Sequence, residues 1–160
     1  MAALGELYDQ DFLRWCEEQA AALRRAKPDS DLALDWDNLA EEIESLGKSQ
    51  RSALRSQLRR ILRHLFKLEA SPAHDPRAGC EESIVDARME IEDILQDSPS
   101  LRVEIAQLIA EQTATAAKLA ALDLERHGER ADAVRASVEA GGFTVEQVLG
   151  DWVPEPPANC

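Results

Sequence analysis

The chain has 160 residues, of which 31 are Asp or Glu and 18 are Lys or Arg, so its formal net charge at pH 7 is −13. This charge disfavours general binding to nucleic acid or to an anionic membrane surface, because phosphate groups would be repelled. The composition is 44% hydrophobic but only 4% aromatic, and its many Ala, Leu, Glu and Arg residues favour helices. We therefore expect one all-α domain over 1–160, with a core at about 7–128 and short C-terminal helices and a tail at 129–160.

Nothing in the sequence predicts a membrane protein or a secreted one. No apolar run approaches the roughly 18 residues of a membrane-spanning helix, and the first residues lack the pattern of a secretory signal. The three cysteines are scattered and form no CxxC pair, which is typical of reduced thiols in the cytoplasm. They are Cys16, Cys80 and Cys160.

The first helix is predicted to begin at Asp9, whose short carboxylate can accept from free amides of the first turn. Tyr8 and Leu13 would form the apolar pair across this start. The helix is expected to end near Ala26, because residues 27–30 read Lys-Pro-Asp-Ser and proline disfavours its continuation.

A central helix over residues 35–69 organises the chain, with Asp35 as its N-cap. At about 1.5 Å per residue it would extend about 52 Å, against a diameter of about 39 Å for a compact domain of this size. A bend or break near Gly47 would relieve this excess; an overhang covered by a second subunit is the alternative. Two apolar stripes are predicted to be buried. The first contains Leu39, Ile43 and Leu46, and the second contains Leu54, Leu58, Ile61, Leu62, Leu65 and Leu68.

The second half of the central helix is basic, with seven cations and no acid between Lys48 and Lys67. Residues four apart drift about 40° around a helix, so these cations form two groups. Arg51 and Arg55 lie beside the apolar stripe and are candidates for structural ion pairs. The outward group is a candidate surface for an anionic partner, although the acidic segment 80–97 is the expected counter-charge inside the molecule. The outward group consists of Arg59, Arg60, Arg63 and Lys67.

A third helix is predicted at about 80–96, after a loop marked by prolines, and a fourth from Ser98 to about His127, with Ser98 as N-cap and Pro99 in the first turn. The fourth helix carries apolar and small polar residues at heptad spacing, which indicates a packed bundle seam or, alternatively, a dimer-forming coiled coil. Gly128 is expected to end it. The seam positions are Leu101, Ile105, Leu108, Gln112, Thr115, Leu119 and Leu122.

No motif for catalysis or for a cofactor is found. There is no Glu-x-x-His pair of a di-iron bundle, no glycine-flanked serine and no phosphate-binding glycine loop. Glu42 lies near the apolar edge of the central helix and His64 borders its stripe, so these two are the weak candidates for acid–base or metal chemistry. We expect no metal and no cofactor, and an enzyme is the less favoured class.

Four stretches of the chain resemble, in order, segments of the bacterial domain of unknown function 29 family. They are LYDQDFLRWCEEQAAALR, LDWDNLAEEIESLGKSQRSALRSQLRRILRHLFKL, SIVDARMEIEDILQDSPSL and FTVEQVLGDWVP. LAEEIESLG and DSPSL are the most specific of these words. The resemblance spans about residues 7–154 and implies an all-helical bacterial cytoplasmic protein with no established activity. The chain departs from the family at Cys80, where members usually have tryptophan, and at 129–142, which is more helical.

These patterns lead to three hypotheses for function. The first is a non-enzymatic helical module that binds another protein or a second copy of itself. The second is a binder of nucleic acid or another anionic partner through the outward cations of the central helix. The third, the weakest, is an enzyme with a site at Glu42 and His64.

Overall fold

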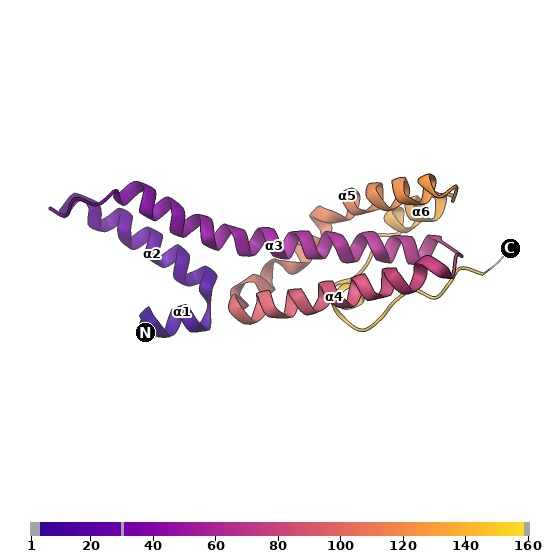
Figure 1. Ribbon diagram of the computed structural model, residues 1–160, viewed down its shortest axis with the longest axis horizontal. Coiled ribbons are helices and arrows are strands. Elements are labelled where there is room, and N and C mark those ends of the chain that lie inside the picture. The colour runs from indigo at the N-terminus through magenta and orange to yellow at the C-terminus, as the bar shows by residue number, and fades with distance from the viewer. Residues whose placement is uncertain (1–3, 30, 159–160) are drawn as a thin grey trace. The chain divides into compact units, whose positions relative to one another are not determined.

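The computed structural model describes residues 4–29 and 31–158, and each regular element within them is a helix (Figure 1). None of the helices described is long and apolar enough to cross a membrane. The predicted all-α fold, with four long helices and short helices after them, is confirmed. The elements are α1 (Leu4–Gln10), α2 (Phe12–Ala26), η1 (Lys27–Asp29), α3 (Trp36–Ala70), α4 (Asp75–Asp97), η2 (Pro99–Glu104), α5 (Ile105–Arg126), α6 (Asp132–Glu139) and α7 (Val145–Leu149).

The contacts of the chain form two compact units. Unit 1 contains residues 1–54 and 92–103, and unit 2 contains residues 55–91 and 104–160. Helices α3 and α4 therefore each contribute one part to each unit.

In unit 1, α2 packs closely against the first part of α3 at Gly47. A Cβ atom at Gly47 would lie 3.0 Å from Leu13 Cδ1 and 3.1 Å from Cys16 Cβ. Helix α3 continues through this glycine to Ala70, so the predicted break is absent, and a bend there stays a prediction. The glycine is explained by the close approach of α2, which leaves no room for a side chain.

In the first apolar stripe of α3, Ile43 is half-buried, and the prediction of burial is wrong for Leu39 and Leu46. Leu39 and Leu46 are exposed, whereas Ala40 and Gly47 are buried. The face that contacts α2 is therefore the face with the smallest side chains. Small residues let two helix backbones approach closely. Helix α2 therefore packs on this face of α3, and the adjacent leucines remain exposed to solvent. Asp35 does cap α3, since its Oδ1 accepts from Asn38 N at 3.3 Å.

Residues 11 and 98–100 hold the start of α2 in place by hydrogen bonds. Asp11, not Asp9 as predicted, is the N-cap: its Oδ1 accepts from Arg14 N at 3.0 Å, and its Oδ2 accepts from Ser100 N at 2.7 Å. Ser98 is fully buried, and its Oγ accepts from Leu13 N at 3.2 Å. An additional helix, α1, precedes Asp11, so the buried carboxylate is the one at the junction between two helices.

The core of unit 2 is built around the second part of α3, and here the predicted second stripe is confirmed. Its buried residues cover a broad face, because the helix has neighbours on more than one side. Phe66 packs against Phe143 with ring centroids 4.8 Å apart. The buried side chains of this part of α3 are Leu58, Ile61, Leu62, Leu65, Phe66 and Leu68.

Two helix starts differ from the sequence prediction. Helix α4 begins at Asp75, five residues before the predicted start, because Pro76 in a first turn needs no amide partner and does not prevent a helix. The fourth helix is preceded by the 3₁₀ segment η2, and Ser98 serves α2 with its hydroxyl instead of capping α5. Both differences concern local signals that more than one structure can satisfy.

The predicted heptad positions of α5 are buried only in the first half of the helix. Ile105 and Leu108 are buried, but Thr115 and Leu122 are exposed. The buried face continues instead through Ala116, Ala120 and Leu124. A straight α-helix has 3.6 residues per turn, so its buried face drifts away from a strict 3.5-residue pattern.

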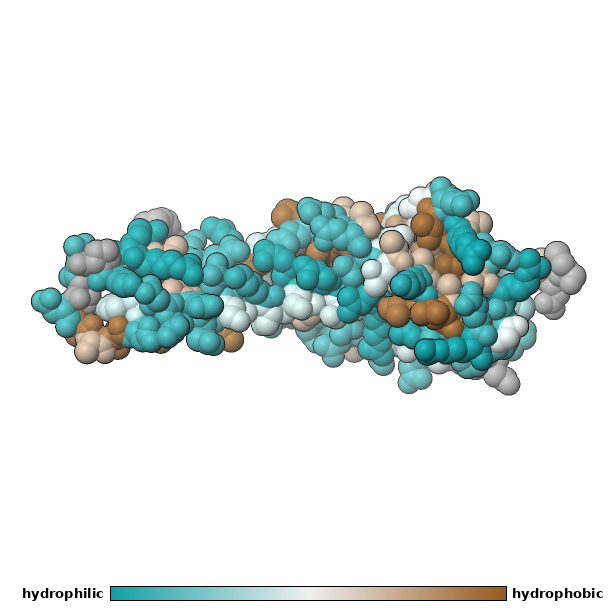
Figure 2. All heavy atoms as spheres, turned by 90° about the horizontal axis from the view of Figure 1, so that it is seen from above, coloured by the Kyte–Doolittle hydropathy of each residue, from teal (hydrophilic) through white to brown (hydrophobic). Residues whose placement is uncertain are grey.

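The C-terminal part of unit 2 is held by backbone contacts. Gly128, with φ of 73°, ends α5 as predicted, and Glu129 N donates to Leu124 O at 2.9 Å. A capping box from Thr144 to Gln147 opens α7. Arg88 donates to the carbonyls of Val148 and Trp152. These arginine contacts to the backbone, together with the ring contact between Phe143 and Trp152, attach the last residues. In Figure 2, which views the molecule from the side of α5 and α6, apolar side chains lie exposed over these helices.

Candidate functional site

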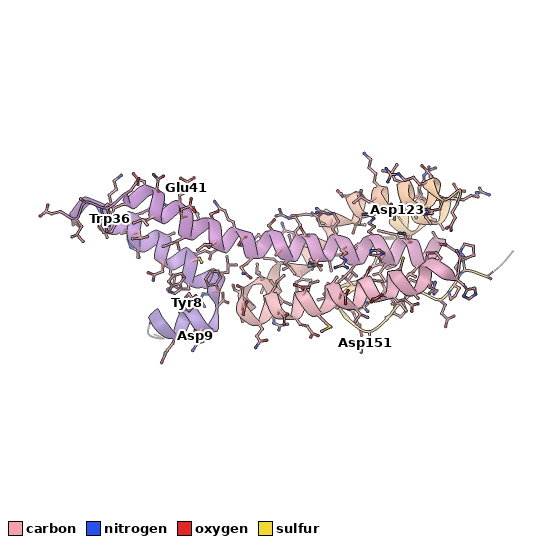
Figure 3. All side chains as sticks on the ribbon, viewed as in Figure 1. Tyr8, Asp9, Trp36, Glu41, Asp123 and Asp151 are labelled. Atoms are coloured by element: carbon pink, nitrogen blue, oxygen red, sulfur yellow. The ribbon has the colours of Figure 1, made fainter. Side chains whose placement is uncertain are left out.

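The basic part of α3 contacts Asp123 on α5. Arg63 binds both carboxylate oxygens of Asp123, with Nε and Nη2 each 2.8 Å from an oxygen, and Lys67 Nζ lies 3.4 Å from Oδ2. Figure 3 labels Asp123 on α5. Burial alone would raise the pKa of Asp123, but the hydrogen bond from Arg63 and the charges of Lys67 and Arg63 outweigh it and lower the pKa. Asp123 is therefore a firmly ionised counter-charge for α3.

The acidic segment 80–97 is expected to provide that counter-charge, but it is not the partner of Arg63 and Lys67. Glu81 pairs with Arg77 on the same helix at 3.2 Å, and the remaining six carboxylates of the segment are exposed. The outward cations are half-buried rather than free in solvent, and Arg59 donates to Gln112 of α5 at 3.2 Å. Sequence periodicity could not show that α5 covers this side of α3.

The remaining sequence candidates lie as follows. Arg51 approaches Glu17 of α2 at 3.9 Å, and Arg55 is half-buried. Glu42 is exposed and shares the uninterrupted helix α3 with His64. Glu42 belongs to unit 1 and His64 to unit 2, so neither compact unit contains both residues. Within residues 4–29 and 31–158, no group of three His, Cys, Asp or Glu residues is arranged to hold a metal.

His64 is nevertheless unusual. Burial, followed by the charges of Lys67, Arg63 and Arg60, lowers its pKa to about 4. Its Nδ1 is buried and accepts no hydrogen bond from the described residues. His64 is therefore a neutral imidazole at the edge of the core at neutral pH.

A cavity of about 150 Å³ lies in unit 2, where the end of α3, the start of α4 and the end of α5 meet. One part of its lining is apolar and includes Leu68, Ala73 and Leu124. The polar part of the lining consists of Lys67, Ser71, Arg77, Cys80, Asp123, His127 and Glu129. No pattern in the sequence predicts this cavity, because its residues come from three segments and match no motif.

The lining of the cavity offers hydrogen-bond donors and acceptors, and its thiol is not activated. Burial is the largest effect on Cys80 and raises the pKa of its thiol, so the thiol stays protonated and is a poor nucleophile. Nδ1 of His127 lies 2.8 Å from Asp123 O. Because a carbonyl only accepts, Nδ1 must carry the proton, and in the neutral ring Nε2 is an acceptor. Oε2 of Glu129 is buried without a hydrogen-bond partner among the described residues.

A second candidate site is an exposed apolar surface of unit 1, here named the leucine surface. It is formed by the first turns of α3, where Figure 3 labels Trp36 and Glu41, and by the segment just before them. Between residues 31 and 46 there are six carboxylates and no Lys or Arg. The exposed fractions of its leucines are 66% for Leu32, 49% for Leu34, 41% for Leu39 and 50% for Leu46.

A model of one protein family, described as a domain of unknown function, DUF29, matches residues 7–152. The chain belongs to the DUF29 family. It is also similar to a solved α-helical protein of unknown function from Rhodospirillum rubrum, with 24% sequence identity, a TM-score of 0.74 and 89% of each chain covered. No curated protein matches the chain. These findings establish the family and the fold and assign no activity to this DUF29 protein.

Two stretches that resemble the family have a structural explanation in this DUF29 chain. In DSPSL, Ser98 and Ser100 hold the start of α2 through Leu13 and Asp11. In LAEEIESLG, Ala40 and Gly47 supply the small face against which α2 packs. Both stretches belong to unit 1, and LAEEIESLG also carries Leu39 and Leu46 of the leucine surface.

Proposed function

We propose that this DUF29 protein is a non-enzymatic interaction module whose leucine surface binds a helix of another protein. The observation that carries the proposal is the exposure of four leucines, Leu32, Leu34, Leu39 and Leu46, around one helix start. Such clusters on a protein surface are typical of protein–protein contacts. A bound helix would cover them as an amphipathic helix covers a groove, with anchors three and four residues apart.

The charge around the leucine surface indicates the chemistry of the partner. Residues 31–46 contain six carboxylates and no cation. Two copies packed through this surface would bring like charges together, which opposes association. A helix with Leu or Ile on one face and Lys or Arg along the edges would complement both features. A second copy of the chain is therefore the alternative occupant that the experiment must separate.

The two other hypotheses lack comparable support. Lys67 and Arg63 contact Asp123, and Arg59 contacts Gln112, so these cations already have partners inside unit 2. Glu42 is exposed in unit 1 and His64 lies in unit 2, so no compact unit contains both residues. The buried thiols of Cys16 and Cys80, with no disulfide between described cysteines, and the similarity to a bacterial structure support the proposal of a bacterial cytoplasmic protein.

The test is the binding of two labelled synthetic helices to the full chain. Both helices carry the same leucine stripe; one has lysine edges and the other has glutamate edges. The double variant Leu39→Gln and Leu46→Gln removes two exposed side chains and should leave the fold intact. We expect tight binding of the lysine-edged helix only, weakened at least tenfold, or by about 1.4 kcal/mol, in the double variant.

The matched control is Val85→Gln with Met89→Gln, which changes two exposed apolar residues of α4 and should not alter binding. Equal binding of the two helices, or equal binding to wild type and the double variant, would refute the proposal. Sedimentation velocity over a concentration series separates the alternative occupant: dimerisation lost in the double variant would assign the leucine surface to a second copy instead.

A further inference from the structure

The cavity of unit 2 has unsatisfied hydrogen-bonding capacity of both kinds. Glu129 Oε2 is buried with no donor among the described residues, and a buried carboxylate oxygen without a donor is costly. His127 Nε2 provides another acceptor, because Nδ1 is committed to Asp123 O. Lys67 has three N–H groups, of which its contact with Asp123 Oδ2 uses one. A ligand that suits this lining must donate at one end and accept at the other.

Arg77 lines the cavity, and three of its five N–H groups are already engaged. Its Nε pairs with Glu81, and its two terminal nitrogens donate to Leu68 O and Pro154 O. Asp123 is likewise engaged by Arg63 and Lys67. Glu129, Lys67 and His127 therefore retain capacity for a ligand, and Arg77 retains two N–H groups.

The fixed charges around the cavity cancel. Among the lining residues, two cations, Lys67 and Arg77, accompany two carboxylates, Asp123 and Glu129. A ligand with net charge would introduce an uncompensated charge into a partly buried space, which is unfavourable. A neutral molecule with separated positive and negative ends would leave the balance intact.

The volume limits the size of the ligand. A cavity of about 150 Å³ is comparable to one that holds a benzene molecule, which corresponds to about six heavy atoms. The apolar wall formed by Leu68, Ala73 and Leu124 would accommodate a small hydrocarbon group between the two charged ends.

We propose that this cavity binds a small zwitterion of the α-amino acid type, about the size of alanine, with its ammonium group at Glu129 and its carboxylate at Lys67. The site lies in unit 2, whereas the leucine surface lies in unit 1, so it does not depend on the proposed partner helix. Its function would be to bind a small metabolite rather than to convert it, because the nearby thiol of Cys80 stays protonated.

The experiment measures binding to the full chain by ¹H–¹⁵N NMR titration with three probes: L-alanine, propionate and ethylamine. Propionate lacks the ammonium group and ethylamine lacks the carboxylate. We expect alanine to shift resonances of residues 67–80 and 123–129 in a saturable way, with at least tenfold weaker binding of the other two probes. Equal binding of propionate or ethylamine, or no saturable shift with alanine, would overturn the proposal and leave the cavity to water.

Two variants test the roles of the charged ends. Glu129→Gln should weaken alanine binding at least tenfold while its circular dichroism stays that of wild type. Lys67→Met should do the same and provides an independent test should Glu129→Gln not fold. The matched control is Glu139→Gln on α6, a carboxylate outside the cavity lining, which should bind alanine as wild type does. Full binding by either folded cavity variant would contradict the assignment.

Discussion

Arg63 and Asp123 form a two-point contact between α3 and α5, in which Nε and Nη2 of the guanidinium each lie 2.8 Å from a carboxylate oxygen. The side chain of Asp123 is only 13% exposed, and Lys67 approaches the same carboxylate. This arrangement places the counter-charge of the basic half-helix on the fifth helix and not on the acidic segment that follows α3 in the sequence.

Replacing Asp123 with Asn should destabilise the protein by about 2 kcal/mol, because Arg63 and Lys67 would lose their common anion in a partly buried site. Urea denaturation measures the change in the free energy of unfolding. Asp132→Asn is the control: Asp132 pairs with Arg130, but both side chains are exposed, and such pairs contribute about 0–1 kcal/mol. Equal losses in the two variants would show that burial does not strengthen the Asp123 contact.

The stability should fall as the pH is lowered from about 6.5 toward about 4. The pKa of His64 is about 4 in the folded chain, below its ordinary value of 6.5, so the unfolded chain binds more protons in this window and acid favours it. Because His64 is incompletely buried, solvent screening reduces the effect to about 1–2 kcal/mol. Denaturation at several pH values measures it. The slope should flatten in His64→Gln and persist in His74→Gln, and an unchanged slope in His64→Gln would exclude this cause.

Asp11→Ala should destabilise the protein by about 2–4 kcal/mol. The carboxylate of Asp11 caps α2 through Arg14 N and also accepts from Ser100 N and Oγ, so three donors would lose their acceptor in a buried site. Thermal and urea denaturation check this result. Asp9→Ala, two residues away and exposed, should change stability by less than about 0.5 kcal/mol. A larger effect at Asp9 than at Asp11 would restore the capping assignment made from the sequence.

The helical glycines Gly47 of α3 and Gly79 of α4 should respond to alanine with opposite signs. At Gly79 nothing lies within 4 Å of the added Cβ, so Gly79→Ala should stabilise by about 0.5–1 kcal/mol through helix propensity. At Gly47 the Cβ would press on Leu13 Cδ1 and Cys16 Cβ, and a crowding cost of about 1–3 kcal/mol should exceed that gain. The melting temperatures of both variants measure these changes in stability. Stabilisation by Gly47→Ala would mean that α2 can shift away from Gly47 at little energetic cost.

Much of the local structure could be predicted because helix signals act over a few residues. The cap at Asp35 and the end at Gly128 both depend on backbone groups one turn away. The second stripe of α3 was also predicted correctly, since it has no competing apolar face beside it. The stripe at Leu39 and Leu46 failed because an adjacent face of small residues was available, and periodicity alone does not choose between them.

The sequence by itself determined the all-α class, the positions of the long helices and the DUF29 membership, because composition, periodicity and caps are properties of neighbouring residues. Only the tertiary structure decided that Asp123 is the partner of Arg63 and Lys67, that Leu39 and Leu46 remain exposed, and that Lys67, His127 and Glu129 share one cavity. The physical reason is that each of these depends on which helices pack together. Packing is settled by side-chain size and charge across segments far apart in the chain, and a pattern within one helix does not contain that information.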